Sequence, residues 1–120
     1  MDRILSPEFE KIFNGTIILD LNIETKLNVK HKVYKEDLVD ALSDPYMVVM
    51  RIKQKSPAPS NKLKSNGTVY ELLAETESAR ILFVVGRLFP EGNLYIITSY
   101  WANKELNSLY YKESEMLRND

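Results

Sequence analysis

Three apolar segments joined by two short turns lie between Thr68 and Trp101, and they constrain the fold more than any other feature of the chain. They read TVYELLAET, ARILFVVGRLF and NLYIITSYW, and their β-branched and aromatic residues suit a pleated, half-buried surface. Between the second and third segments, Pro90 suits the second position of a type I turn and Gly92 falls where the chain needs a positive φ. The stretch therefore predicts an antiparallel β-meander.

Helical and extended patterns flank the meander on both sides. Ser6-Pro7-Glu8 is typical of a helix start, Asn22 and Asn103 can cap helices, and Pro45 must end one. We expect these elements before the meander: a helix over 7–13, a strand or extended entry over 16–21, helices over 23–31 and 35–43, and a strand over 46–53. A last helix follows from about Asn103.

This order predicts an α+β fold, with an antiparallel four-stranded sheet, two helices before it and one C-terminal helix. The 120 residues suit one domain, 1–120, with residues 1–15 as an N-terminal helical extension. Residues 54–67, rich in Pro, Ser and Lys, are expected to form a mobile loop. Apolar runs fall short of the ~18–20 residues that span a bilayer, and the N-terminus lacks a signal-peptide pattern, so a cytoplasmic protein without membrane contact is expected.

The distribution of charge and the residue types present limit the ligands and reactions that we expect for this chain. Residues 26–64 hold nine Lys and Arg against four acids, a local charge of +5, whereas the rest of the chain carries −6. One face could therefore bind an anion, although a solvated lysine-rich region fits the same pattern. The chain has no cysteine and one histidine, which excludes thiol chemistry and multi-histidine metal sites. We expect neither a cofactor nor a metal.

The residues left for catalysis are few, because the glycine-rich phosphate loop, the nucleophile elbow and the HExxH motif do not occur in the sequence. His31 lies between Lys30 and Lys32, and these two cations are expected to keep its imidazole neutral and able to act as a base. A lone histidine at a helix end is, however, more often a surface or packing residue. Tyr100 and Trp101 are adjacent on one strand, so they should point to opposite sheet faces.

Two groups of short motifs resemble the BrnT-type toxins. Lys30-His31-Lys32-Val33 is similar to the Lys-His-Gly-Val that ends the first helix of that family, and Asp44-Pro45 is similar to its Asp-Pro before the first strand. Ile96-Ile97-Thr98-Ser99, followed by Ala102 and Tyr110, resembles its closing Ile-Ile-Ser-Ala-Arg motif and last helix. The resemblance covers residues 17–113.

The resemblance implies a RelE-like fold, metal-independent cleavage of RNA, and silencing by a small antitoxin of the ribbon-helix-helix type. It places His31, Lys30 and Tyr100 as catalytic residues, with Lys26 and Arg80 as substrate-binding residues. The chain departs from the family at the arginine of the closing motif, which falls on Tyr100. Three hypotheses remain: a weak or altered endoribonuclease, a non-catalytic protein-interaction module of the same fold, and an unrelated α+β domain.

Overall fold

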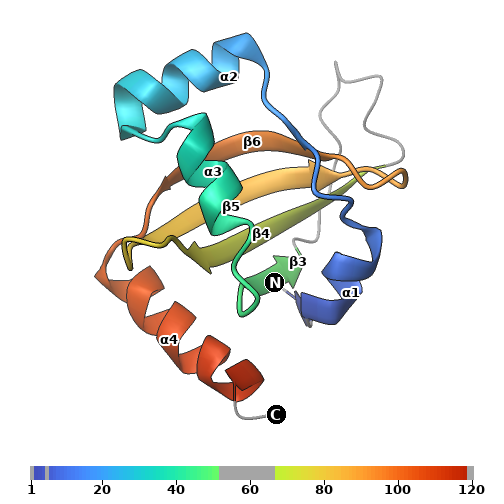
Figure 1. Cartoon of the computed structure of the whole chain (residues 1–120), viewed down its shortest axis with the longest axis vertical. Coiled ribbons are helices and arrows are strands. Elements are labelled where there is room, and N and C mark those ends of the chain that lie inside the picture. The colour runs from blue at the N-terminus through green and yellow to red at the C-terminus, as the bar shows by residue number, and fades with distance from the viewer. Residues whose placement is uncertain (1, 5, 52–66, 119–120) are drawn as a thin grey trace.

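The computed structural model describes residues 2–4, 6–51 and 67–118. Its elements in chain order are β1 (Asp2–Ile4), α1 (Ser6–Ile12), β2 (Ile17–Ile18), α2 (Leu21–Lys26), the π-helical turn η1 (Leu27–His31), α3 (Lys35–Ala41), β3 (Val48–Arg51), β4 (Thr68–Glu75), β5 (Ile81–Leu88), β6 (Leu94–Trp101) and α4 (Lys104–Arg118). Within these residues, six strands form one sheet in the order β1-β3-β4-β5-β6-β2. Figure 1 labels β3, β4, β5 and β6 of this sheet. The fold is α+β, as predicted.

The predicted meander is confirmed as β4, β5 and β6, and β3 extends it at one side. All neighbouring pairs among these four strands are antiparallel. The second turn closes through hydrogen bonds from the Phe89 amide to the Asn93 carbonyl (3.0 Å) and from the Gly92 amide to the Phe89 carbonyl (2.8 Å). Gly92 has φ of 103°, the left-handed conformation expected from the sequence.

The predicted sheet of four antiparallel strands is incomplete. β2 adds to β6 in parallel, with Ile17 opposite Leu94, and β1 adds to β3 in antiparallel fashion. These edge strands are two and three residues long. β2 lies within the strand or extended entry expected over 16–21, whereas β1 was not expected, because three residues are too few to show the alternating pattern by which strands are recognised.

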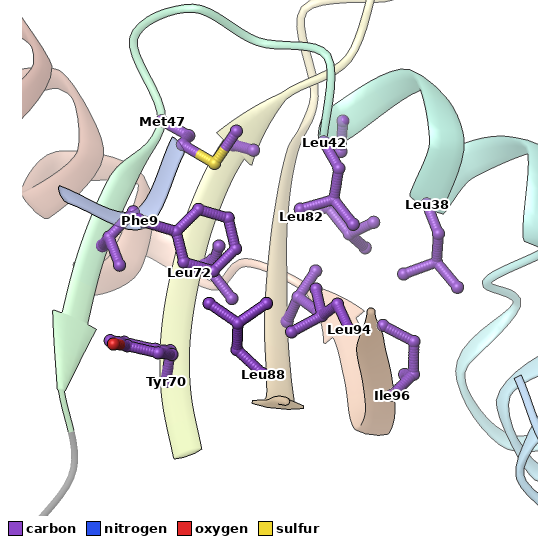
Figure 2. Close-up of a cluster of buried hydrophobic side chains, with 14 of the residues drawn as sticks. Phe9, Leu38, Leu42, Met47, Tyr70, Leu72, Leu82, Leu88, Leu94 and Ile96 are labelled. Carbon is purple, nitrogen blue, oxygen red and sulfur yellow. The ribbon is translucent and has the colours of Figure 1, made fainter. Parts of the chain in front are cut away.

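The first helix, α1, packs against the main body of the fold. Phe9 of α1 is fully buried, and its ring meets the edge of the Tyr70 ring at a centroid distance of 5.5 Å. Figure 2 shows Phe9 among core side chains from β4 and β5. The amide of Asn14, just after α1, also donates to the Gly92 carbonyl at 2.9 Å and so joins α1 to the β5–β6 turn.

Helices cover the two faces of the sheet unequally. One face packs against α1, η1 and α3 around a core that includes Leu38, Leu72 and Leu82, and Figure 1 shows α3 crossing this face. The opposite face packs against α4 through a smaller cluster that includes Phe83 and Tyr110. The end of η1 meets the end of β6 just before α4 begins, and the candidate site lies there.

Helix boundaries differ from the prediction at one place that concerns the site. Asp20, rather than Asn22, caps α2, because its carboxylate accepts the Asn22 amide at 2.8 Å. The predicted helix over 23–31 changes to π-helical geometry at Leu27. Asn103 does cap the last helix, since its side-chain oxygen accepts the Leu106 amide at 2.9 Å. Residues 54–66 of the predicted loop lie outside the described residues.

Candidate functional site

His31 and Tyr100, which lie 69 positions apart in the sequence, meet at the edge of the sheet. Their ring centroids are 5.7 Å apart and their planes are inclined by 45°. Tyr100 also stacks on Phe83 of β5, with ring centroids 4.9 Å apart, which fixes its position on the α4 face of the sheet. Tyr100 is 36% exposed and His31 is half-buried, so a ligand can reach both side chains.

The local backbone explains why His31 reaches this position. The π-helical turn ends at Lys32, which adopts the left-handed conformation (φ 56°, ψ 37°). The Val33 amide then donates to the Leu27 carbonyl at 3.1 Å, and the indole Nε1–H of Trp101 donates to the Lys32 carbonyl at 3.1 Å. Single π-turns and left-handed residues are common at functional sites. Here they hold the end of the helix against the end of β6.

Lys26 and Lys30 lie on the solvent side of the same helical segment. Both side chains are exposed, and neither forms an ion pair with a carboxylate of the described residues. Lys30 immediately precedes His31 in the sequence, and its side chain is open to solvent. Ammonium groups placed in this way attract phosphates as point charges.

Arg80 is not part of the His31–Tyr100 pair. Its guanidinium carbon lies 3.8 Å from the centroid of the Trp101 ring, at the end of the strand. Trp101 packs partly into the core face opposite that of Tyr100, as adjacent strand residues must. The other strand arginine, Arg87, is buried and donates to the Gly67 carbonyl at 3.1 Å. The structure thus brings two of the predicted site residues, His31 and Tyr100, into contact and leaves Arg80 at Trp101, the next position of the strand.

Asp44 of the Asp-Pro motif has a structural role. One carboxylate oxygen accepts the Tyr46 amide at 2.9 Å, and the other accepts the Glu75 amide at 2.9 Å and the Tyr110 hydroxyl at 2.6 Å. Burial, followed by the hydrogen bond to the Asp44 carboxylate, raises the pKa of Tyr110 well above its usual value. This motif therefore ties α4 and β4 to the turn before β3.

Two polar residues near the site were missed by the sequence analysis. Asn107 and Tyr111 of α4 line a depression beside Arg80 and Trp101. Their spacing of four residues places both on one side of a helix. The sequence does not show which part of the sheet this side of α4 packs against. It therefore could not predict that Asn107 and Tyr111 lie beside Arg80.

No protein-family model matches this chain, and no curated protein gives a significant match. No helix of the described residues has the length and apolar character needed to cross a membrane. Across those residues, no group of three or more His, Asp and Glu side chains is placed to hold a metal ion. The candidate site therefore consists of the side chains that meet at the end of β6, around Tyr100 and Trp101.

Proposed function

We propose that this chain is a metal-independent endoribonuclease similar to the BrnT-type toxins, with His31 as general base and Tyr100 as general acid. The contact between the His31 and Tyr100 rings carries the proposal, because it joins two groups that can exchange protons at an accessible surface. Two helices, the antiparallel strands β3 to β6 and a final helix follow one another from α2 to α4, and this order supports the RelE-like fold that the resemblance implies.

The proposed reaction needs one proton acceptor and one proton donor. The 2′-hydroxyl oxygen of the ribose attacks the adjacent phosphorus while His31 accepts the hydroxyl proton. The bond between phosphorus and the 5′-oxygen breaks, and that oxygen takes the hydroxyl proton of Tyr100. The products are a 2′,3′-cyclic phosphate and a free 5′-hydroxyl. The proton on His31 then returns to the Tyr100 oxygen, which restores both groups.

Lys30 and Lys26 would supply positive charge to the phosphate. A tyrosine at position 100 can donate a proton but cannot neutralise an oxyanion, so the cation that the resemblance expects there must come from elsewhere. The exposed ammonium group of Lys30, next to His31, is the nearest candidate in sequence. As in the toxins that the chain resembles, a small antitoxin of the ribbon-helix-helix type is the proposed partner.

The test is cleavage of a single-stranded RNA oligonucleotide by purified protein in the presence of a chelator, with the product ends identified by mass spectrometry. We expect cyclic phosphate ends, and a rate that falls about 100-fold or more in His31→Ala. Lys30→Ala should also lose activity, whereas Lys11→Ala, an exposed lysine of α1, serves as the matched control. Wild-type rates in both His31→Ala and Lys30→Ala would remove this helix from the mechanism.

A second candidate function is a non-catalytic interaction module, which the apolar side chains exposed on the helices favour. Leu21 is 75% exposed, Val29 69% and Val39 50%. Exposed apolar side chains mark a protein contact where they gather in one patch. In this case Tyr100→Phe should have no effect on function, and Tyr100→Arg should strengthen RNA binding by restoring a cation. A strong loss of cleavage in Tyr100→Phe would exclude this candidate.

A further inference from the structure

A surface depression of about 230 Å³ lies where β5 begins and β6 ends. Three elements contribute to its wall: Arg80 precedes β5, Trp101 ends β6, and Asn107 and Tyr111 come from α4. The other lining residues are Ala79, Ile81 and Ala102. Arg80 is thus the one charged residue among the described lining residues, and no carboxylate is among them.

The Arg80 guanidinium is held in place by stacking rather than by an acidic partner. Its carbon lies 3.8 Å from the centroid of the Trp101 ring, and the Trp101 indole is itself fixed by its hydrogen bond to the Lys32 carbonyl. Stacking covers one face of the planar group and leaves its in-plane N–H donors open. Within the described part of the chain, no carboxylate or carbonyl accepts from these donors. The group is therefore a pre-positioned cation with unused donors.

Additional features of the depression suit a small anion. The Asn107 side-chain amide has no hydrogen-bond partner among the described residues, so its N–H donors are available. The volume is below the roughly 300–1,000 Å³ of sites for drug-sized ligands, which indicates a single small group.

We propose that this depression is a second phosphate subsite, which holds the phosphate next to the cleaved bond. The inference rests on the proposed function, because RNA is the ligand that presents two neighbouring phosphates. The depression is lined by α4, which covers the sheet face to which Tyr100 points, so an RNA strand that reaches Tyr100 can extend to the depression. A guanidinium binds two phosphate oxygens through parallel N–H donors. Arg80, which stacks on the residue after Tyr100, thereby provides the cation that Tyr100 cannot provide.

The test follows the Arg80 Nε–H and Trp101 Nε1–H signals by NMR during titration with inorganic phosphate, and with adenosine as a probe without phosphate. Phosphate should shift both signals, and adenosine should not. Arg80→Gln should weaken phosphate binding about tenfold or more, followed through the Trp101 signal. Arg80→Lys, which keeps the charge but loses the planar fork, should fall between Arg80→Gln and wild type.

Lys11→Gln is the matched control for charge, because α1 contacts the β5–β6 turn and so lies at the end of the strands opposite to Arg80. This variant should bind phosphate as wild type does. Absence of a phosphate-dependent shift, equal binding by Arg80→Gln, or equal shifts with adenosine would each overturn the subsite.

The two proposals can fail separately. His31→Ala should abolish cleavage and leave the phosphate titration at Arg80 unchanged, since the imidazole does not line the depression. Phosphate binding at Arg80 in a wild-type protein that cleaves no RNA supports the subsite and overturns the enzyme. Cleavage without any phosphate shift at Arg80 supports the enzyme and overturns the subsite.

Discussion

The Tyr110 hydroxyl donates a 2.6 Å hydrogen bond to the buried Asp44 carboxylate, and this bond helps to join α4 to the turn before β3. Tyr110→Phe removes the donor and leaves one carboxylate oxygen with fewer partners. We expect the free energy of unfolding to fall by about 1–3 kcal/mol in urea denaturation. Tyr111→Phe is the matched control, because its hydroxyl bond to Glu75 is exposed, and it should cost about 0.5 kcal/mol or less.

Tyr110 also makes the free energy of unfolding depend on pH. Burial, and then the Asp44 hydrogen bond, raise the pKa of Tyr110 in the folded protein, whereas the unfolded chain titrates near pH 10. The contribution to stability is therefore complete below about pH 10 and is lost as the pH rises toward the folded pKa. Unfolding free energies measured from pH 8 to 11 should fall more steeply for wild type than for Tyr110→Phe. Parallel curves would show that Tyr110 contributes nothing to this slope.

Single residues of the site could be predicted only where the chain places chemistry in a local pattern. His31 and Lys30 stand out because basic residues cluster at a helix end, and Tyr100 because a tyrosine occupies the place of an expected arginine. The contact of His31 with Tyr100 depends on a π-turn that no local pattern signals. Arg80 was predicted to bind substrate, but its stacking on Trp101 depends on the register of β5 against β6.

At the scale of elements, the β5–β6 turn packs directly on the end of α1, and two glycines allow this contact to be tested. Gly92 and Gly15 both have positive φ, of 103° and 89°. A Cβ at Gly92 would lie 2.5 Å from the Ile12 carbonyl oxygen, whereas a Cβ at Gly15 would have nothing within 4 Å. Each alanine substitution should cost about 1–2 kcal/mol of backbone strain, and Gly92→Ala should cost more because of the clash.

The measurement is chemical denaturation of Gly92→Ala and Gly15→Ala side by side with wild type. A clearly larger loss of unfolding free energy in Gly92→Ala is the expected result. Equal losses would show that α1 moves away from the turn without cost and that the contact between the Asn14 amide and the Gly92 carbonyl has little value.

The long strands of the sheet could be predicted from the sequence more readily than the short ones. Each strand of the meander has eight residues, enough for composition and turn signals to identify it. β1, which the sequence did not predict, is a strand because β3 offers it an unpaired edge, and that edge is a property of the assembled sheet. The role of α1 likewise depends on Tyr70, a residue 61 positions away from Phe9 that completes its pocket.

Across the whole molecule, a net charge of −1 conceals a basic helical segment at the proposed RNA site. RNA affinity should therefore fall as salt rises, because bound phosphates release their counterions. Lys26→Gln should weaken binding without regard to RNA sequence and reduce the slope of log affinity against log salt by about 1. The measurement is fluorescence anisotropy with a labelled oligonucleotide at several salt concentrations. Lys11→Gln should keep the wild-type slope, and a Lys26→Gln slope equal to that of wild type would place the RNA elsewhere.

The central claim is that His31 and Tyr100 act as one catalytic pair, and a double-mutant cycle of RNA cleavage tests it most directly. Rates in chelator would be measured for wild type, His31→Ala, Tyr100→Phe and the double variant, with melting temperatures to confirm folding. Each single change should lower the rate about 100-fold or more, and the double variant should cleave no more slowly than the slower single variant. Cleavage by folded Tyr100→Phe at the wild-type rate, or losses that multiply in the double variant, would contradict the account.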